Sequence, residues 1–388
     1  MHNKSWLWFA AGLLVIGTLG AAQGPQFGQP LAGLPPDVLA LFEAGQEEFE
    51  AAADVGKGLG PVFNDVSCVA CHSNPKVGGD SNITETRFGR ITKGAFDPMT
   101  ERGGSLLQVR GVDPGRGCGP EIVPPEATII AKRKTTSLFG LGLVDNVPDT
   151  TFLDIARAQQ ARTPEVAGQP SIVKDVTSGR HRLGRFGWKA QVATLMTFAA
   201  DAYLNEMGIT SPTFPKKNLP NGDASRLEQC NGLKSDPEDN GDAVAAFTDF
   251  MMFLAPPPRG PITAQVTAGQ AVFDQIGCAS CHVRALTTGP NAIAALDRVR
   301  FEPFSDFLLH DMGSLGDSIE QGAAGGRQMR TAPLWGLRVR TTYLHDGRAS
   351  NVEAAILAHD GQGRGAMREY THLDDAGKRA LRAFLQSL

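Results

Sequence analysis

Two short segments of the chain have the residue types and the spacing of a covalent haem site. Each reads Cys-x-x-Cys-His, over residues 68–72 and residues 278–282. Two thiols three positions apart can form thioether bonds to the two vinyl groups of one haem, and the adjacent imidazole can then bind the iron. The sequence therefore predicts two c-type haems, with electron transfer between them. The predicted attachment and proximal residues are Cys68, Cys71 and His72 in the first motif and Cys278, Cys281 and His282 in the second.

A four-cysteine zinc site is the alternative interpretation of these motifs. Zinc ribbons usually separate their cysteine pairs by about 15–20 residues, whereas these pairs begin at positions 68 and 278. Zinc also gives no reason for a histidine directly after both pairs. The haem interpretation is therefore favoured.

The first 22 residues have the pattern of a bacterial secretion signal. Lys4 supplies a positive charge, residues 6–16 are an apolar segment too short to span a bilayer comfortably, and residues 20–22 offer small side chains for cleavage. An uncleaved membrane anchor is the alternative. Because c-type haem is attached outside the bacterial cytoplasm, we expect a periplasmic mature chain without a stable membrane span.

The composition favours a loop-rich protein built around haems. The formal net charge is −4, and no basic run points to nucleic acid as a partner. With 388 residues, 41% of them hydrophobic, the chain can bury two haem-centred cores. The 45 glycines and 25 prolines favour short helices and loops, with few short strands.

An internal repeat indicates a duplicated haem unit. Val62 and Phe63 precede the first motif at the same spacing as Val272 and Phe273 precede the second. The match does not extend further back, because Gly269 aligns with a leucine. A second block, over residues 134–141, recurs in the same order over residues 330–337. Two shared blocks in one order indicate duplication.

Three consecutive prolines at 256–258 mark the boundary between the two units, because they cannot continue a helix. The predicted organisation is a signal peptide over 1–22, an N-terminal haem domain with an inserted segment over 23–255, and a C-terminal haem domain over 256–388. The predicted fold class is mainly α, with two cytochrome-c-like domains packed together.

Apolar spacing predicts the helices that surround the motifs. We expect a helix over about 266–276 before the second motif, and one within 41–53 before the first. Asp374 and Asp375 suit the start of a C-terminal helix, where acidic side chains favour the helix dipole.

The second half offers more candidate axial ligands than the first. His359 follows a predicted short helix over 351–358, capped by Asn351 or Ser350, and shares one face with Val352 and Ile356. A histidine that only favours the helix dipole is the alternative. The other candidates are His310, His345, His372, Met312, Met329 and Met367.

No histidine lies between His72 and His181, and His181 belongs to a basic segment that we expect to be exposed. An open position on the first iron is the simplest account, and it would let peroxide or oxygen bind. The alternative sixth ligands are Met99, Met196, Met207 and Cys118. In an oxidising compartment Cys118 can instead pair with Cys230, and two free thiols are the third possibility.

Two further residues could take part in chemistry. Trp188 lies in the segment 184–190, which we expect to open a helix that continues through Tyr203 to Glu206. A carboxylate above an open haem could move protons, and a tryptophan between two haems could carry an electron. A surface glutamate and a core tryptophan are the alternatives.

Blocks along nearly the whole mature chain resemble the bacterial di-haem oxidoreductase family, whose members are often labelled thiol oxidoreductases. The family belongs to the superfamily of di-haem cytochrome c peroxidases and MauG-type protein-oxidising enzymes. The blocks lie over residues 63–68, 77–79, 137–143, 183–190, 309–313, 330–337 and 344–349.

The resemblance implies roles for individual residues. His359 lies where the peroxidases carry the distal methionine of the electron-transfer haem, which implies a bis-histidine haem of lower potential. Trp188 looks like the tryptophan between the haems, and Glu206 looks like the distal catalytic glutamate. Phe198 stands where a distal glutamine is expected. No removable distal histidine precedes Trp188, so the chain looks more like the members whose first haem is always open.

The resemblance also implies a function. Hydrogen peroxide would be reduced at the haem of His72, with Glu206 as general acid–base and Trp188 on the electron route. A small periplasmic donor, a cytochrome c or a cupredoxin, would supply electrons through the C-terminal haem, and a calcium ion would lie between the domains. The alternatives are an oxygen-using di-haem oxygenase, a MauG-like enzyme that oxidises a partner protein, and a non-catalytic electron-transfer cytochrome.

Overall fold

The computed structural model describes residues 24–231, 235 and 237–388. The predicted signal peptide therefore lies outside the described residues. Within the described part of the chain, no helix has both the length and the apolar character that a membrane span requires.

The chain is mainly helical and loop-rich with short strands, as the sequence predicts. The α-helices are α1 (Pro36–Glu50), α2 (Leu141–Asp145), α3 (Asp149–Arg162), α4 (Leu195–Met207), α5 (Ala224–Cys230), α6 (Asp242–Phe253), α7 (Ala264–Gln275), α8 (Val352–Leu357), α9 (Arg364–His372) and α10 (Asp375–Leu385). The strands are β1 (Val62–Phe63), β2 (Thr84–Thr92), β3 (Ala95–Asp97), β4 (Leu106–Leu107), β5 (Arg110–Gly111), β6 (Ile129–Lys134), β7 (Ser171–Lys174), β8 (His181–Gly184), β9 (Leu286–Thr287), β10 (Arg300–Phe301), β11 (Leu309–Asp311) and β12 (Gln328–Arg330).

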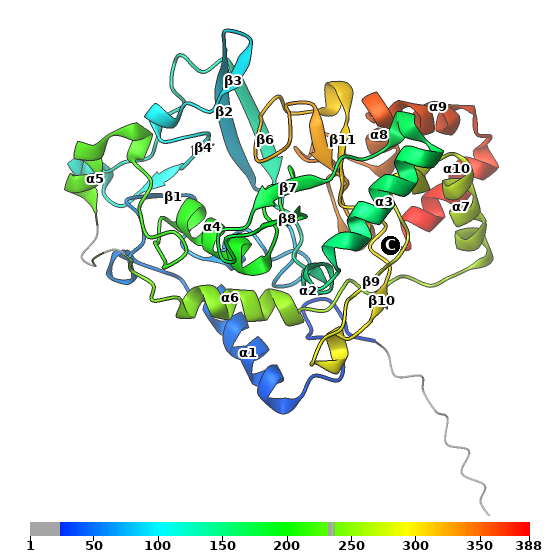
Figure 1. Cartoon of the computed structure of the whole chain (residues 1–388), viewed down its shortest axis with the longest axis horizontal. Helices are drawn as coiled ribbons and strands as arrows, with labels where there is room; N and C mark the ends of the chain where they lie inside the picture. The colour runs from blue at the N-terminus through cyan, green and yellow to red at the C-terminus, as the bar shows by residue number, and fades with distance from the viewer. Residues whose placement is uncertain (1–23, 232–234, 236) are drawn as a thin grey trace, which may run out of the picture.

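The largest sheet contains β2, β3, β4 and β6, and β2 pairs antiparallel with each of the other three. The remaining pairs among the described strands are two-stranded: β1 with β5, β7 with β8, β9 with β10, and β11 with β12. Figure 1 shows α7, α8, α9 and α10 grouped together, away from α1 and α6. The extended segment at 255–263 joins α6 to α7. The predicted domain boundaries stay a prediction.

In each half, the helix before the haem motif crosses a second helix at a glycine. α1 packs on α6, and α7 packs on α10 (Figure 1). A Cβ atom on Gly45 would lie 2.4 Å from the carbonyl oxygen of Ala246, and one on Gly269 would lie 1.9 Å from that of Ala380. The two helix backbones therefore touch at both crossings, which only glycine permits.

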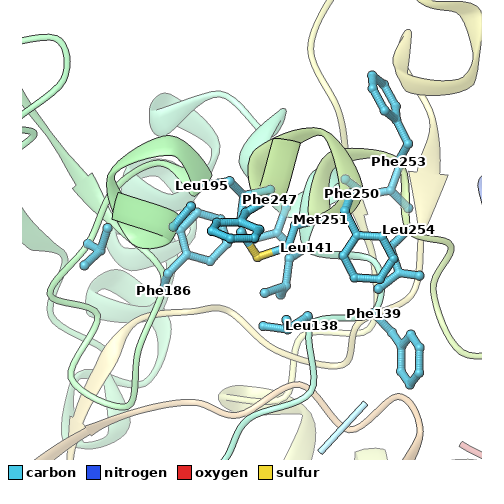
Figure 2. Close-up of a cluster of buried hydrophobic side chains, with 14 of the residues drawn as sticks. Leu138, Phe139, Leu141, Phe186, Leu195, Phe247, Phe250, Met251, Phe253 and Leu254 are labelled. Atoms are coloured by element: carbon cyan, nitrogen blue, oxygen red, sulfur yellow. The ribbon is translucent and has the colours of Figure 1, made fainter. Parts of the chain in front are cut away.

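Two hydrophobic cores surround these crossings. The larger one gathers side chains from α6, α4 and the segment 138–141, as Figure 2 shows. The smaller one joins α7 to α10 and includes Phe273, Phe304, Leu381 and Phe384. Trp335, from the C-terminal repeat block, belongs to the larger core, so the two halves of the chain share buried surface.

Four predicted helices are confirmed. α7 buries Val266, Gly269 and Phe273, as the spacing predicts. α8 begins after Asn351, whose side chain accepts a hydrogen bond from the backbone of the third helical residue. The C-terminal helix α10 has Asp374 as its N-cap. The expected helix before the first motif is α1, which ends at residue 50.

The predicted helix from residue 184 is wrong over its first part. Residues 185–194 form turns, and α4 begins only after its N-cap Thr194. Gly187 and Ala190 have positive φ angles of 77° and 48°, and a right-handed helix cannot contain them. Trp188 therefore lies in a loop.

The second repeated block also folds alike in both halves. Gly140 and Gly336 each have a φ of 72°, a left-handed conformation that favours glycine. Each glycine precedes a helical turn, α2 in the first half and the 3₁₀ turn Leu337–Val339 in the second. The structural repeat therefore supports the duplication that the sequence predicts.

Replacing Gly45 or Gly269 by alanine should separate the crossing helices and lower the free energy of unfolding by about 1–3 kcal/mol, the usual cost of overpacking. Urea denaturation followed by circular dichroism measures the change. Glu47→Ala, on the exposed side of α1, is the matched control and should change it by less than about 0.5 kcal/mol. Wild-type stability in both glycine variants would contradict the close crossings.

Candidate functional site

A cavity of about 230 Å³ lies beside the first motif, and Cys68, Cys71 and His72 line it. The two cysteines lie in and directly after a 3₁₀ turn, Cys68–Ala70. His72 Nδ1 lies 3.1 Å from the carbonyl oxygen of Gly79 and donates to it. Burial lowers the pKa of His72 to about 4, so the imidazole is neutral at neutral pH. A neutral imidazole with Nδ1 tied to the backbone presents Nε2 as a metal ligand.

A larger cavity, of about 400 Å³, lies beside the second motif. Cys278, Cys281 and His282 line it, and the 3₁₀ turn Cys278–Ser280 has the form of its counterpart. His282 Nδ1 donates to the carbonyl oxygen of Phe304 at 3.0 Å. Burial, and then the neighbouring His359, lower the pKa of His282 to about 4. Both proximal histidines are therefore held in the same tautomer by the same kind of bond.

The repeated block supports the proximal histidine in both halves. The backbone N–H of Leu138 donates to the carbonyl of Gly78, the residue just before Gly79. In the second half, the N–H of Leu334 donates to the carbonyl of Pro303, the residue just before Phe304. The repeated blocks at 134–141 and 330–337 therefore have the same structural role. Each one holds in place the backbone segment whose carbonyl accepts the hydrogen bond from the proximal histidine.

His359 lies in the second cavity together with His282. Val352, Ala355 and Ile356 of α8 also line this cavity, so the predicted helix face is the one that meets it. His359 Nδ1 donates to the carbonyl of Ala355 at 2.8 Å, and burial lowers its pKa. Neither His359 Nε2 nor His282 Nε2 has a hydrogen bond to the described residues. The second cavity is therefore lined by two neutral imidazoles, those of His282 and His359.

Of the other histidines of the second half, His310 lines the cavity but has a partner at each ring nitrogen. His310 Nε2 lies 3.0 Å from a carboxylate oxygen of Asp306, and its Nδ1 lies 3.6 Å from the sulfur of Cys281. Burial alone would lower the pKa of His310, but the Asp306 carboxylate outweighs it and raises the pKa to about 10. His345 lines the cavity, whereas His372 does not. Met312, Met329 and Met367 also line it.

The first cavity contains no second histidine among the described lining residues. Of the alternative ligands, Met207 lines it, whereas Met99 and Met196 do not. Cys118 forms a disulfide with Cys230, with the Cα atoms 5.6 Å apart, so its thiolate is not available to iron. His181 is exposed on β8, as expected.

Glu206, near the end of α4, lines the first cavity instead. Asn64 Nδ2 donates to Glu206 Oε2 at 2.6 Å, and the side-chain Oδ1 of Asn64 accepts from the backbone N–H of Val109 at 3.0 Å. Burial, and then the nearby Glu85 carboxylate, raise the pKa of Glu206 to about 7, while Asn64 and Arg87 act in the opposite direction. A carboxyl group with a pKa near neutrality can both donate and accept a proton.

Asn64 is a site residue that the sequence analysis missed. It lies four positions before Cys68, and its partner Glu206 lies 142 residues further along the chain. Its backbone N–H also donates to the backbone carbonyl of Glu206, at 2.7 Å. The segment that carries the first haem motif is therefore fixed to the candidate acid–base group.

Charged residues of β2 and α4 complete this side of the first cavity. Arg87 pairs with Glu85 at 2.9 Å, and Asp201 also lines the cavity. Phe198, which stands where the family's glutamine is expected, lines it as well, and so does Gln191.

Trp188 lines both cavities. Its indole Nε1 donates to the carbonyl of Lys134 at 2.8 Å, and its ring centre lies 6.2 Å from that of His345. The loop that replaces the predicted helix thus brings one aromatic ring to the walls of both cavities.

Both cavities offer what a covalent haem requires. Each has two partly buried thiols and a neutral proximal imidazole, and burial raises the pKa values of Cys68 and Cys278 to about 12. The remaining walls are largely apolar, with Phe49, Leu138, Phe247 and Met251 in the first cavity and Phe273, Ile276, Leu337, Leu381 and Leu385 in the second.

A family model described as "Di-haem oxidoreductase, putative peroxidase" matches residues 125–388, more than half of the chain. The chain belongs to the di-haem oxidoreductase family. Two haems follow from that membership, in agreement with the two motifs and the two cavities. The calcium ion between the domains stays a prediction.

The di-haem oxidoreductase is also similar to solved structures, with TM-scores of 0.42 in each case. Hydrazine synthase of Kuenenia stuttgartiensis is 14% identical, over 98% of this chain and 100% of that chain. A MauG-like protein associated with microbial copper homeostasis is 15% identical, over 99% and 95%. The diheme peroxidase BthA of Burkholderia thailandensis is 15% identical, over 92% and 86%. No curated protein matches the chain.

Replacing Asn64 by leucine should raise the pKa of Glu206, because the variant removes a donor that stabilises the ionised carboxylate. The carboxyl stretching band in infrared difference spectra, titrated between pH 5 and pH 9, measures this pKa. The midpoint should move upward from its wild-type value near 7. Asn82→Ala, at an exposed asparagine, is the control and should leave the midpoint in place. An unmoved midpoint in Asn64→Leu would contradict the assigned hydrogen bond.

Proposed function

We propose that this di-haem oxidoreductase is a periplasmic peroxidase, which reduces hydrogen peroxide in the first cavity with electrons relayed through the second. One observation carries the proposal: the two cavities differ on the side opposite the proximal histidine. The first presents Glu206, with a pKa near 7, and no further histidine among its described lining residues. The second presents His359. One site is equipped for proton transfer and the other for electron transfer.

The overall reaction consumes one hydrogen peroxide, two protons and two electrons, and yields two water molecules. A haem iron held by His72 would supply the redox chemistry at the O–O bond. Glu206 holds a proton on its carboxyl group and transfers it to the departing oxygen. Since its pKa lies near neutrality, the carboxylate can regain a proton between turnovers. Asn64 keeps the carboxyl group in position through its amide.

The second cavity would supply the electrons. His282 and His359 would both ligate its iron, which leaves no position for peroxide. Trp188, on the walls of both cavities, would lie on the route between them. We expect the electrons to come from a small periplasmic protein, a cytochrome c or a cupredoxin. The difference between the two cavities also makes a non-catalytic cytochrome the weaker alternative. Electron transfer alone does not require a carboxyl group with a pKa near neutrality beside the haem.

Glu206→Gln tests the proposal, because glutamine keeps the size and the polarity but cannot transfer a proton. The rate of peroxide reduction should fall by about 10²–10⁴-fold, the usual contribution of general acid–base catalysis. Stopped-flow absorbance with a reduced donor measures it, and the haem content per chain should not change. Glu43→Gln, an exposed substitution on α1, should retain the wild-type rate. A wild-type rate in Glu206→Gln would reject the assigned role.

A further inference from the structure

Arg330 differs from the other buried cationic side chains of the described chain. The other five each form an ion pair with a carboxylate: Arg133 and Lys189 with Asp317, Lys134 with Asp80, Arg185 with Asp149, and Lys217 with Glu238. Arg330 is only 7% exposed and has no carboxylate partner among the described residues. Its Nε donates to the carbonyl of Gly187 at 2.7 Å and its Nη1 to that of Thr331 at 3.0 Å. Its Nη2 has no hydrogen-bond partner in the described part of the chain.

A second arginine without an ion pair to the described residues, the partly exposed Arg340, lies nearby. Arg340 lines the second cavity together with Arg330, and each has its pKa lowered by burial. The Arg340 charge contributes to the lowered pKa of Arg330, which falls to about 10, so the two guanidinium groups repel each other. The only hydrogen bond of the Arg340 side chain to the described residues goes to the carbonyl of Pro333, at 3.5 Å.

The carboxylates that act on these arginines, Asp306 on Arg330 and Asp80 on Arg340, do not line the second cavity and are paired with His310 and Lys134. Among the described residues that line this cavity, the single acidic one is Glu165, which is exposed and forms no ion pair with either arginine. Withdrawing a guanidinium from water without an anion costs several kcal/mol. An occupant of the cavity that brings negative charge would therefore stabilise both groups.

The first cavity shows the opposite arrangement. Its cationic lining residues Arg87, Arg133 and Lys134 are each paired with a carboxylate, on Glu85, Asp317 and Asp80 respectively. The unpaired cations are therefore confined to the second cavity.

We propose that Arg330 and Arg340 bind the two propionate groups of the haem in the second cavity. The inference rests on the proposed presence of that haem, and two guanidinium groups match its two carboxylates in number and sign. The planar guanidinium donates to a carboxylate with two parallel N–H groups. The backbone N–H of Arg330 also donates to the carbonyl of Trp188 at 2.9 Å, so this arginine is bonded to the loop on the proposed electron route. The propionates would then be bound next to the loop that carries Trp188.

These two positive charges have a consequence for the haem potential. Cations close to a haem favour its reduced form, since reduction removes one positive charge from the iron. Two histidine ligands give a lower potential than histidine and methionine. The arginines would raise the potential of a bis-histidine haem and keep it able to accept electrons from its donor.

Redox titration of the complete di-haem protein, followed by absorbance in the absence of peroxide, tests the proposal. Arg330→Gln and Arg340→Gln should each shift the second haem toward its oxidised form by about tenfold, which is 59 mV for one electron. The first haem should shift less. Arg330→Lys keeps the charge but not the planar guanidinium. Its second haem should therefore have a potential closer to the wild-type value than that of Arg330→Gln. Arg338→Gln, at an exposed arginine in the same segment, should leave both haems unchanged.

Unchanged potentials of the second haem in both glutamine variants, with two haems still bound, would overturn the proposal. Arg340 is partly exposed and makes one long hydrogen bond, so Arg340→Gln decides the matter if Arg330→Gln fails to fold. The titration requires no turnover. A wild-type protein that does not reduce peroxide would therefore contradict the proposed function, while the potentials would still decide the role of the arginines.

Discussion

The hydrogen bond from the Nδ1 of each proximal histidine to a backbone carbonyl determines how both haem cavities are built. It fixes the ring orientation and the tautomer, so that Nε2 is presented as a ligand. The acceptors, Gly79 and Phe304, are themselves positioned, because the repeated block bonds to the carbonyl of the residue just before each of them. Motif, acceptor and repeated block thus form one unit, and this unit is what the chain contains twice. The crossing helices at Gly45 and Gly269 pack around it.

Against this shared proximal architecture, the distal sides have diverged in chemistry. The first cavity carries carboxylates, and its cations are neutralised by partners within the protein. A carboxyl group whose pKa lies near neutrality suits proton transfer to a small substrate. The second carries His359 and two arginines without an ion pair, a combination that suits the proposed electron-transfer haem. Trp188 lines both cavities, so one side chain lies between the two chemically different sites.

Much of the site could be predicted from local sequence. The helix α8, which precedes His359, and the N-caps of α8 and α10 depend on neighbouring residues, and the structure has them as expected. The loop at 185–194 could not be predicted in this way, because Gly187 and Ala190 have positive φ angles and the loop is hydrogen-bonded to the distant Arg330. The pairing of Cys118 with Cys230 was one of three open possibilities, and the structure selects it.

Contacts between distant residues account for what the sequence did not show. Asn64 reaches Glu206 across 142 residues, and the equivalence of Gly45 and Gly269 is hidden because the two helices lie at different distances from their motifs. The lack of a carboxylate near Arg330 is a property of a cavity wall and not of a motif. Such features need the packed structure to be recognised.

Electron paramagnetic resonance of the oxidised protein as isolated tests the central claim most directly, that one haem is open and the other is closed by His359. The account predicts one high-spin ferric signal and one low-spin signal typical of two histidine ligands, in equal amounts. Two low-spin signals without a high-spin signal would contradict it.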